Sequence, residues 1–492
     1  MTIITNEKTQ KIVKNTKGRA MPMELAKKRH ILNKPARATV WYISAAALAR
    51  GVGVLGTPVF TRLLSPSEYG IFPLYNTWMA LFTVITTLGI TGGIALAGLS
   101  HFRDRREDYI SASTGLLAAL LLFFTLVYLI ASPVINALTG LSTPLTLVML
   151  IQIFALGITN LYYDGEKYLY RYAHASLLTV FSSLLSPILS VYIITYTDLR
   201  GEGRILGAML AALISAIPIF AAILRQSSRL LDTEIWKYII KRAAPLLPHY
   251  LSCAVILRVG EATVGRVFGT VALGKYSVAL SLGLSLSVVT GGLISAVGPW
   301  VLRKLKQNNV ASIKEILLVI TRSLALFSLL VLSFAPEAMK ILTPPEYHDC
   351  LIAVYPLSLS MIPSFLSSVL TQGEMYYSRS VIMNLPTVTA AGVSTLLSLI
   401  LLPRLDYRFV ALFVLLSYVT MLIINVFIFK RIAGEIPICI ESTALIFALA
   451  MLYGSILAAS GGNFALRVIL AIPLIPLLLI EGKRAYSLVR EK

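Results

Sequence analysis

Four charged side chains lie within apolar segments of this chain, where their types and spacing could bind an anion. Arg258, Glu261 and Arg266 fall in residues 243–270, and Arg50 falls in an apolar segment far upstream. Ionisable groups at bilayer depth cost roughly 2.5–3.5 kcal/mol each on insertion scales, so they usually face a protein interior or a watery cavity. At about 100° per residue, the three charges of 243–270 share one broad helical face. Arginine binds phosphate through a planar fork of donors, so the cluster predicts a phosphate or pyrophosphate site.

Each of these charges also has a purely structural interpretation. Arg258 and Glu261, three residues apart, could form an ion pair that only stabilises the helix. Arg50 could donate to backbone carbonyls at a helix break beside the neighbouring glycines. Arg266, closer to the end of its segment, could extend its charge to the surface. The functional interpretation requires Arg50 and Arg258 to face one cavity from opposite sides, with Glu261 tuning the field or binding a coupling proton.

The composition places these charges in a polytopic membrane protein. Hydrophobic residues make up 57% of the 492 residues and charged residues 13%, with a mean hydropathy of +0.79. A soluble domain usually has about 25% charged residues. The net charge of +20 does not indicate nucleic-acid binding, because the Lys and Arg residues gather at the ends of apolar segments.

The sequence carries no motif of an enzyme, a metal site or a cofactor site. It has no Walker A motif, no HExxH and no pair of carboxylates at bilayer depth. The three cysteines form no CxxC pair, and the five histidines have no metal-binding spacing. We therefore expect a transporter rather than an enzyme, with no metal and no cofactor. Transport would be passive or driven by an ion gradient or the membrane potential.

Fourteen segments are long and apolar enough to cross a bilayer, which needs about 20 residues. Pro133, Gly140 and Pro144 mark a turn that divides the uncharged stretch 110–163 into two spans. The sequence thus predicts an all-α polytopic protein with about 14 transmembrane helices, at 40–60, 70–98, 111–132, 143–163, 172–196, 205–224, 243–268, 276–299, 316–335, 351–372, 380–402, 409–429, 442–460 and 464–481.

The loop charges predict the orientation in the membrane. With the N-terminus in the cytoplasm, the cytoplasmic segments hold 31 of the 43 Lys and Arg residues, and the outer loops hold eight. This bias follows the positive-inside rule, so we expect both termini in the cytoplasm. No signal peptide is evident in the first 39 residues, which are polar and basic.

A weak internal repeat predicts two related halves. Residues 60–74 align with 264–278 at a constant offset of 204, which pairs Gly70 with Gly274. Each segment follows the first span of a six-span block, and an even number of spans inserts both blocks in the same orientation, as parallel repeats. The expected division is a basic cytoplasmic tail (1–39), an N-terminal six-helix bundle (40–224), a cytoplasmic linker (225–242), a C-terminal six-helix bundle (243–429), and helices 13 and 14 with a cytoplasmic tail (430–492).

Two short motifs resemble those of a known family. The string TRLLSPSEYGIFPL after the first span, with Arg50 upstream, resembles the start of bacterial polysaccharide transporters, and so does the turn Gly274-Lys275-Tyr276-Ser277. This family includes the O-antigen flippases and lies within the multidrug/oligosaccharidyl-lipid/polysaccharide exporter superfamily. The resemblance implies a V-shaped pair of six-helix bundles that opens alternately to each side of the bacterial inner membrane. Spans thirteen and fourteen depart from the common twelve-span plan, although related flippases of lipid-linked precursors have fourteen.

The resemblance also implies a substrate. Family members move undecaprenyl-pyrophosphate-linked oligosaccharides from the cytoplasmic to the outer leaflet, and their cationic cavity maps onto Arg50, Arg258 and Arg266. Arg50 and Arg258 would then bind the pyrophosphate, and Arg266 would assist its outward passage. We therefore expect a flippase of O-antigen, lipopolysaccharide or other surface-polysaccharide biosynthesis, among membrane lipids and beside a polysaccharide polymerase or ligase.

Two other functions stay open. A cation-coupled multidrug exporter of the same superfamily would have the same architecture, but it would need an acidic cavity. A membrane scaffold that organises a polysaccharide-synthesis complex would need no charge at bilayer depth.

Overall fold

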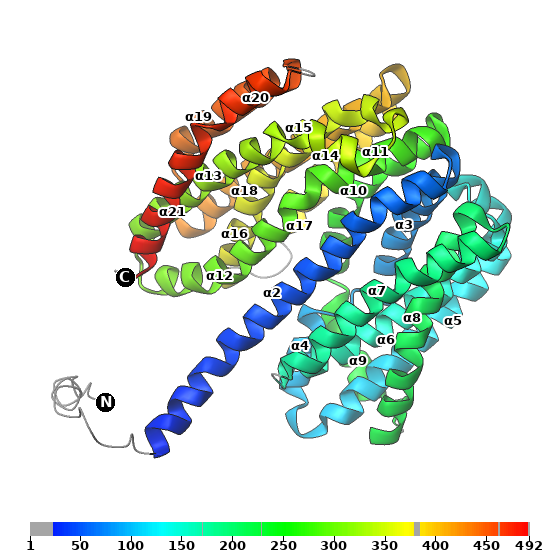
Figure 1. Ribbon diagram of the computed structural model, residues 1–492. Helices are drawn as coiled ribbons and strands as arrows, with labels where there is room; N and C mark the ends of the chain where they lie inside the picture. Colours follow the sequence, from blue (N-terminus) through cyan, green and yellow to red (C-terminus); the bar gives the residue numbers. More distant parts are fainter. Residues whose placement is uncertain (1–22, 170, 228, 378–383, 461–462, 491–492) are drawn as a thin grey trace.

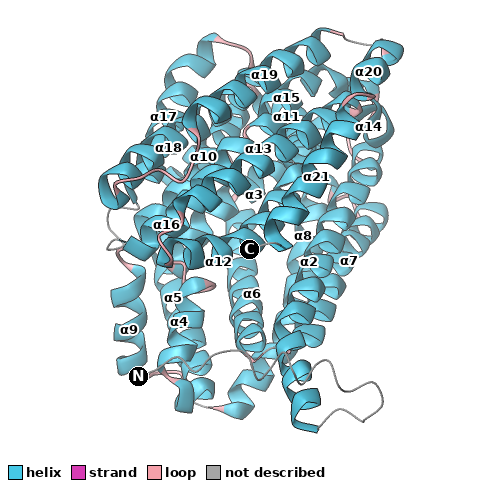
Figure 2. Ribbon diagram, turned by 90° about the vertical axis from the view of Figure 1, so that its left-hand side faces the viewer, coloured by secondary structure: helices cyan, strands magenta, loops and turns pink. Residues whose placement is uncertain are grey.

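The computed structural model describes residues 23–169, 171–227, 229–377, 384–460 and 463–490, and these ranges contain helices and no strand (Figure 2). Its first half comprises α2 (Met23–Leu63), α3 (Pro66–Thr87), α4 (Gly93–His101), α5 (Arg106–Thr139), α6 (Thr143–Tyr168), α7 (Tyr172–Tyr196), α8 (Arg200–Gln226) and α9 (Thr233–Ala243). Its second half comprises α10 (Leu247–Val267), α11 (Gly269–Gly283), the 3-10 turn η2 (Leu284–Leu286), α12 (Ser287–Lys306), α13 (Val310–Ser333), α14 (Ala335–Leu342), the 3-10 turn η3 (Pro345–Cys350), α15 (Leu351–Leu359), α16 (Met361–Tyr377), α17 (Asn384–Leu396), α18 (Val410–Ala433), α19 (Ile440–Ala459), α20 (Phe464–Ala471) and α21 (Leu474–Arg490).

The expected class, an all-α polytopic membrane protein, is confirmed. In the described part of the chain, 11 helices are long and apolar enough to cross a membrane, or 12 if the bent pair α9 and α10 counts as one span. These account for twelve of the fourteen expected spans. Of the other two, 40–60 falls on α2 and 70–98 falls on α3 and α4, and none of these helices reaches that combination of length and hydropathy.

The ends of several elements differ from the sequence expectation. α2 begins at Met23, so its helix runs through the second part of the expected tail 1–39, whose first 22 residues lie outside the described range. The expected linker 225–242 contains the short helix α9, which meets α10 at an angle of 55°. α9 packs on the first half, where the Trp236 indole donates to the Ala112 carbonyl at 2.9 Å and Arg105 pairs with Asp232 at 2.5 Å.

The expected second span, 70–98, is broken in the middle. α3 ends at Thr87, and three of the next five residues have positive φ: Leu88 at 51°, Gly89 at 64° and Gly92 at 76°. Glycine adopts this left-handed backbone without a steric penalty, which explains why the chain turns here. The Asp164 carboxylate of α6 accepts a 2.6 Å hydrogen bond from the Gly92 amide and so secures the break.

The helices gather into two bundles, with α2 to α9 in one and α10 to α21 in the other (Figure 1). We call the end of the bundles where α2 begins and α21 ends the terminus side, and the end where α2 finishes at Leu63 the opposite side. The two bundles approach each other at the opposite side and splay apart toward the terminus side (Figure 1). The principal contacts between them run from α3 to α10 and α11.

Glycines allow α3 and α11 to cross with their backbones in contact. A Cβ at Gly70 would overlap the carbonyl oxygen of Thr270, and a Cβ at Gly274 would lie 2.8 Å from the carbonyl oxygen of Pro66. The contact is reciprocal, because Pro66 and Thr270 are related by the same offset of 204 as Gly70 and Gly274. Two related halves that meet through the same positions form a two-fold, self-complementary interface.

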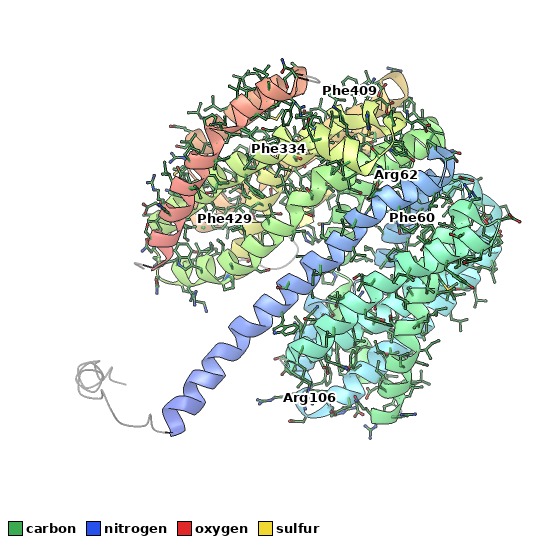
Figure 3. All side chains as sticks on the ribbon, viewed as in Figure 1. Phe60, Arg62, Arg106, Phe334, Phe409 and Phe429 are labelled. Atoms are coloured by element: carbon green, nitrogen blue, oxygen red, sulfur yellow. The ribbon has the colours of Figure 1, made fainter. Side chains whose placement is uncertain are left out.

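Further contacts at the opposite side join the two bundles near this crossing. At the end of α2, the Arg62 guanidinium donates to the Ile341 carbonyl at 3.1 Å, and the Thr61 hydroxyl donates to the Leu342 carbonyl at 3.2 Å. Figure 3 places Phe60 and Arg62 at this end of α2 and Arg106 at the far end of the first bundle. The Tyr69 ring of α3 packs edge-on against the Tyr347 ring of η3, with centroids 5.8 Å apart. These contacts and the crossing close the opposite side.

Two ion pairs hold the last helices, α20 and α21, against the second bundle. Arg467, only 1% exposed, donates two hydrogen bonds of 2.7 and 2.6 Å to Glu337 of α14 and one to the Ser333 carbonyl. These bonds hold the pKa of the Glu337 carboxyl below its ordinary value. Nearer the terminus side, Arg322 of α13 pairs with Glu481 at 3.4 Å. Both arginines therefore secure the C-terminal helices through carboxylates far away in the sequence.

We expect Gly70→Ala to loosen the opposite side, because the new methyl group overlaps the Thr270 backbone and overpacking costs about 1–3 kcal/mol. The measurement is the labelling rate of a cavity cysteine, Ser277→Cys in a background without native cysteines, by a membrane-impermeant maleimide added at the opposite side. Gly70→Ala should raise this rate several-fold. Gly392→Ala is the matched control, because a Cβ there meets no atom within 4 Å. Equal labelling of the two variants would show that the crossing does not hold the bundles together.

Candidate functional site

A cavity of about 680 Å³ lies between the two bundles. Helices α2, α3 and α8 line it on one side, and α10, α11, η2 and α12 line it on the other. Its walls are formed by Ala47, Arg50, Gly51, Gly53, Val54, Thr57, Tyr69, Phe72, Pro73, Asn76, Met79, Ala80, Arg204, Arg258, Glu261, Ser277, Leu280, Ser281, Leu284, Ser285 and Val288. Three of the four expected site residues, Arg50, Arg258 and Glu261, are among them.

Arg258 and Glu261 form a close ion pair at the cavity wall. The Arg258 Nη1 donates to Glu261 Oε2 at 2.5 Å, and the Thr77 hydroxyl of α3 donates to the same oxygen at 3.2 Å. The Glu261 side chain is 3% exposed, whereas 30% of the Arg258 side chain stays exposed. The carboxylate is therefore enclosed by donors from both bundles, and the guanidinium keeps a face toward the cavity. Arg258 therefore forms a structural ion pair with Glu261 and also presents its charge to the cavity.

Arg50 reaches the cavity from α2, in the opposite bundle. Its Nη1 donates to the Ser287 hydroxyl of α12 at 2.6 Å, and this hydrogen bond links the two bundles. A hydroxyl is a neutral partner, and no carboxylate among the described residues lies within salt-bridge distance of Arg50. Gly51 and Gly53 lie within the continuous helix α2, so Arg50 does not mark a helix break. The positive charge of Arg50 is therefore available to an anion.

Arg266 is not brought into this site. It lies in the last turn of α10, at the opposite side, where it is exposed, and it does not line the cavity. Both the charge cluster and the resemblance predicted a place for Arg266 in the anion site, and this conformation does not bring it to the cavity with Arg50 and Arg258.

The third arginine of the cavity is Arg204, which was not among the expected site residues. α8 begins at Arg200, so Arg204 lies in its second turn rather than just before the span that was expected at 205. Its guanidinium carbon lies 4.2 Å from the Phe60 ring centroid, 4.8 Å from Tyr69 and 4.1 Å from Phe72. The sequence signal that could have found it is weak: three aromatic residues within the repeat segment 60–74, with no indication that α8 packs beside them.

The balance of charges gives the cavity its chemistry. Arg50, Arg204 and Arg258 face a single carboxylate, Glu261, which leaves two positive charges in excess. Hydroxyl and amide groups supply the remaining polar surface, from Thr57, Asn76, Ser277, Ser281 and Ser285. Such a cavity attracts an anion with neutral hydrogen-bonding groups and disfavours a cation. No group of three or more His, Cys, Asp or Glu side chains in the described ranges could hold a metal ion.

The fold and the cavity define a polytopic membrane protein with two facing helical bundles and a cationic centre. A family model described as polysaccharide biosynthesis protein matches residues 36–304, which is more than half of the chain. The protein therefore belongs to the polysaccharide biosynthesis protein family. The family expected from the motifs after the first and seventh spans is thereby confirmed.

Solved structures share this fold at low sequence identity. The lipid II flippase MurJ, in an inward closed conformation, superposes with a TM-score of 0.60 at 13% identity, covering 91% of this chain and 99% of that one. An inward-facing MATE family multidrug resistance transporter of the MOP superfamily has a TM-score of 0.55 at 16% identity, covering 85% and 96%. An outward-facing MATE transporter has 0.54 at 16% identity, covering 87% and 97%. No curated protein matches the chain by sequence.

We expect Glu261→Ala to destabilise the protein, because it leaves the partly enclosed Arg258 without its counter-charge. Breaking such a pair from one side costs about 2 kcal/mol or more. The double variant Arg258→Met, Glu261→Leu removes both charges and should recover most of that loss. Thermal unfolding of the purified protein in detergent measures both changes. Glu202→Gln, at an exposed position of α8, is the control. Wild-type stability in Glu261→Ala would contradict a pairing role for this carboxylate.

Proposed function

We propose that this protein is a flippase that moves an undecaprenyl-pyrophosphate-linked oligosaccharide from the cytoplasmic to the outer leaflet of a bacterial inner membrane. The observation that carries the proposal is the convergence of Arg50 and Arg258, from opposite bundles, on one cavity with excess positive charge. Membership of the polysaccharide biosynthesis protein family supports it, as does the fold shared with a lipid II flippase.

The pyrophosphate would bind between Arg50 and Arg258. Each phosphate of a pyrophosphate diester carries one negative charge, so the group matches the two excess positive charges of the cavity. Arginine holds phosphate oxygens with two parallel hydrogen bonds, and the pairing strengthens in a low-dielectric site. Glu261 and Thr77 would fix Arg258, and the Ser287 hydroxyl would fix Arg50 until the anion replaces it. In this proposal Glu261 positions a cation rather than carrying a proton.

The sugars and the lipid would occupy different surroundings. The hydroxyl and amide side chains of the cavity would bind the sugars, which are neutral donors and acceptors. The polyprenyl chain would stay in the membrane beside α2 and α12, where the Arg50–Ser287 hydrogen bond spans the two bundles. The proposed orientation puts the terminus side in the cytoplasm, as the loop charges predict. This structure, closed at the opposite side, would then be a state that loads from the cytoplasm.

The alternative, a cation-coupled multidrug exporter, shares the fold, because MATE transporters superpose on this chain. Its substrates are expected to be cations, which need acidic groups in the cavity. The one cavity carboxylate, Glu261, is already paired with Arg258 and enclosed. The charge balance therefore favours the flippase.

The test is flipping by the purified protein in liposomes. The probe is a polyprenyl-pyrophosphate disaccharide with a fluorophore on the sugar, and dithionite reports how much of it reaches the outer leaflet. Wild-type protein should flip the probe, and Arg258→Ala and Arg50→Ala should each slow flipping at least about tenfold, since each removes a charge-assisted bond to phosphate. Arg404→Ala, an exposed cation outside the cavity, is the control.

Two results would contradict the proposal. One is wild-type flipping by Arg258→Ala at a normal level of folded protein. The other is a wild-type protein that lowers the accumulation of cationic drugs in cells and does not flip the probe.

A further inference from the structure

Arg204 is held in a cage of aromatic rings at the closed end of the cavity. Phe60 comes from α2, and Tyr69 and Phe72 come from α3, with the guanidinium carbon 4.1–4.8 Å from all three ring centroids. Rings at these distances attract a cation through their faces. They fix the position and direction of the guanidinium, but they do not neutralise its charge.

The charge of Arg204 lacks a counter-ion. None of the carboxylates in the described residues lies within salt-bridge distance of it, and its Nη1 is buried with no hydrogen-bond partner. Glu68, an acid on the neighbouring α3, is already bound by Arg200 at 3.1 Å and by the Ser65 amide at 2.8 Å. A guanidinium that is held rigidly, lines a cavity and keeps one nitrogen without an acceptor is suited to bind an anion.

Arg204 lies nearer the opposite side than Arg50 and Arg258. The Tyr69 ring of its cage and Thr77, which contacts Glu261, are separated by eight residues of α3, or about 12 Å at 1.5 Å per residue. Along α2, Phe60 lies ten residues beyond Arg50, or about 15 Å. The cage also borders the closure, because Tyr69 packs against Tyr347 of the other bundle. The three arginines therefore lie at two depths of one cavity.

We propose that Arg204 is a second subsite for the phosphoryl anion, which receives the substrate's pyrophosphate from Arg50 and Arg258 as it moves toward the opposite side. This inference rests on the proposed function. Two subsites of moderate affinity, one after the other along the cavity, let an anion move by exchange between donors. A single site of high affinity would retain it. The subsite also lies where the passage has to open, between Tyr69 and the contacts that close the opposite side.

A purely structural role for Arg204 makes a different prediction about stability. If the guanidinium mainly anchors α8 to α2 and α3, then its removal must destabilise the fold. If its function is to bind an anion, then without the substrate it is a partly buried charge that lacks a counter-ion. An apolar side chain of similar length should then leave the stability of the folded protein unchanged or raise it. Methionine fits this test, because its thioether packs well against aromatic rings.

The experiment compares Arg204→Met with the wild type in the same liposome assay and in thermal unfolding. We expect maximal flipping to fall at least about tenfold, the probe concentration at half-maximal flipping to change less than twofold, and the unfolding temperature to stay equal or rise. Arg258→Ala should instead raise that half-maximal concentration, because it acts at the loading subsite. Arg204→Lys keeps a charge between the rings but lacks the planar fork, so it should retain part of the maximal rate.

Arg225→Gln is the control, because Arg225 is an exposed arginine in the last turn of α8, at the other end of that helix from Arg204. Normal flipping by Arg204→Met beside an inactive Arg258→Ala would overturn the second subsite and leave the proposed function intact. A lower unfolding temperature with a proportional loss of flipping would show that Arg204 stabilises the fold, and would also overturn the second subsite. Failure of the wild type to flip the probe would instead reject the proposed function.

Discussion

The reciprocal crossing of α3 and α11 is the contact on which the rest of this structure depends. It brings the backbone at Gly70 against Thr270 and the backbone at Gly274 against Pro66, with no side chain between them. Close backbone approach of this kind is how small residues join helices in membranes, where the hydrophobic effect does not favour one apolar contact over another. The crossing closes the opposite side, and it brings α2 and α10 of related halves to the same cavity. Arg50 of α2 and Arg258 of α10 therefore line one cavity from opposite bundles.

The arginines at bilayer depth then divide into two groups by their partners. Arg467 and Arg322 pair with Glu337 and Glu481 and hold the C-terminal helices in place. The cavity arginines are left with fewer partners: Arg258 has an enclosed carboxylate, Arg50 has a hydroxyl, and Arg204 has aromatic rings. A charge without a full partner costs free energy in the folded protein. Such charges are found at sites where a ligand supplies the missing interaction.

The sequence predicted most of the fold and part of the site. Hydropathy and length identified the helices, and the offset of 204 identified the pair Gly70 and Gly274, which the structure brings together at the crossing. Arg50, Arg258 and Glu261 were identified because an isolated charge in an apolar segment is visible in the sequence. Arg204 was missed and Arg266 was placed in the cavity because both lie near span ends, where helix packing decides which way a side chain faces. The domain boundaries at 224 and 243 stay a prediction.

We propose that one anion binds between the two bundles, at Arg50 and Arg258. The most direct test is a cryo-EM structure of the protein in lipid nanodiscs with a polyprenyl-pyrophosphate disaccharide. We expect density for the pyrophosphate within hydrogen-bond distance of both guanidinium groups, with the disaccharide among the hydroxyl groups of the cavity and the polyprenyl chain outside the bundles. A pyrophosphate bound away from the cavity, or bound with both arginines turned from it, would contradict this binding site.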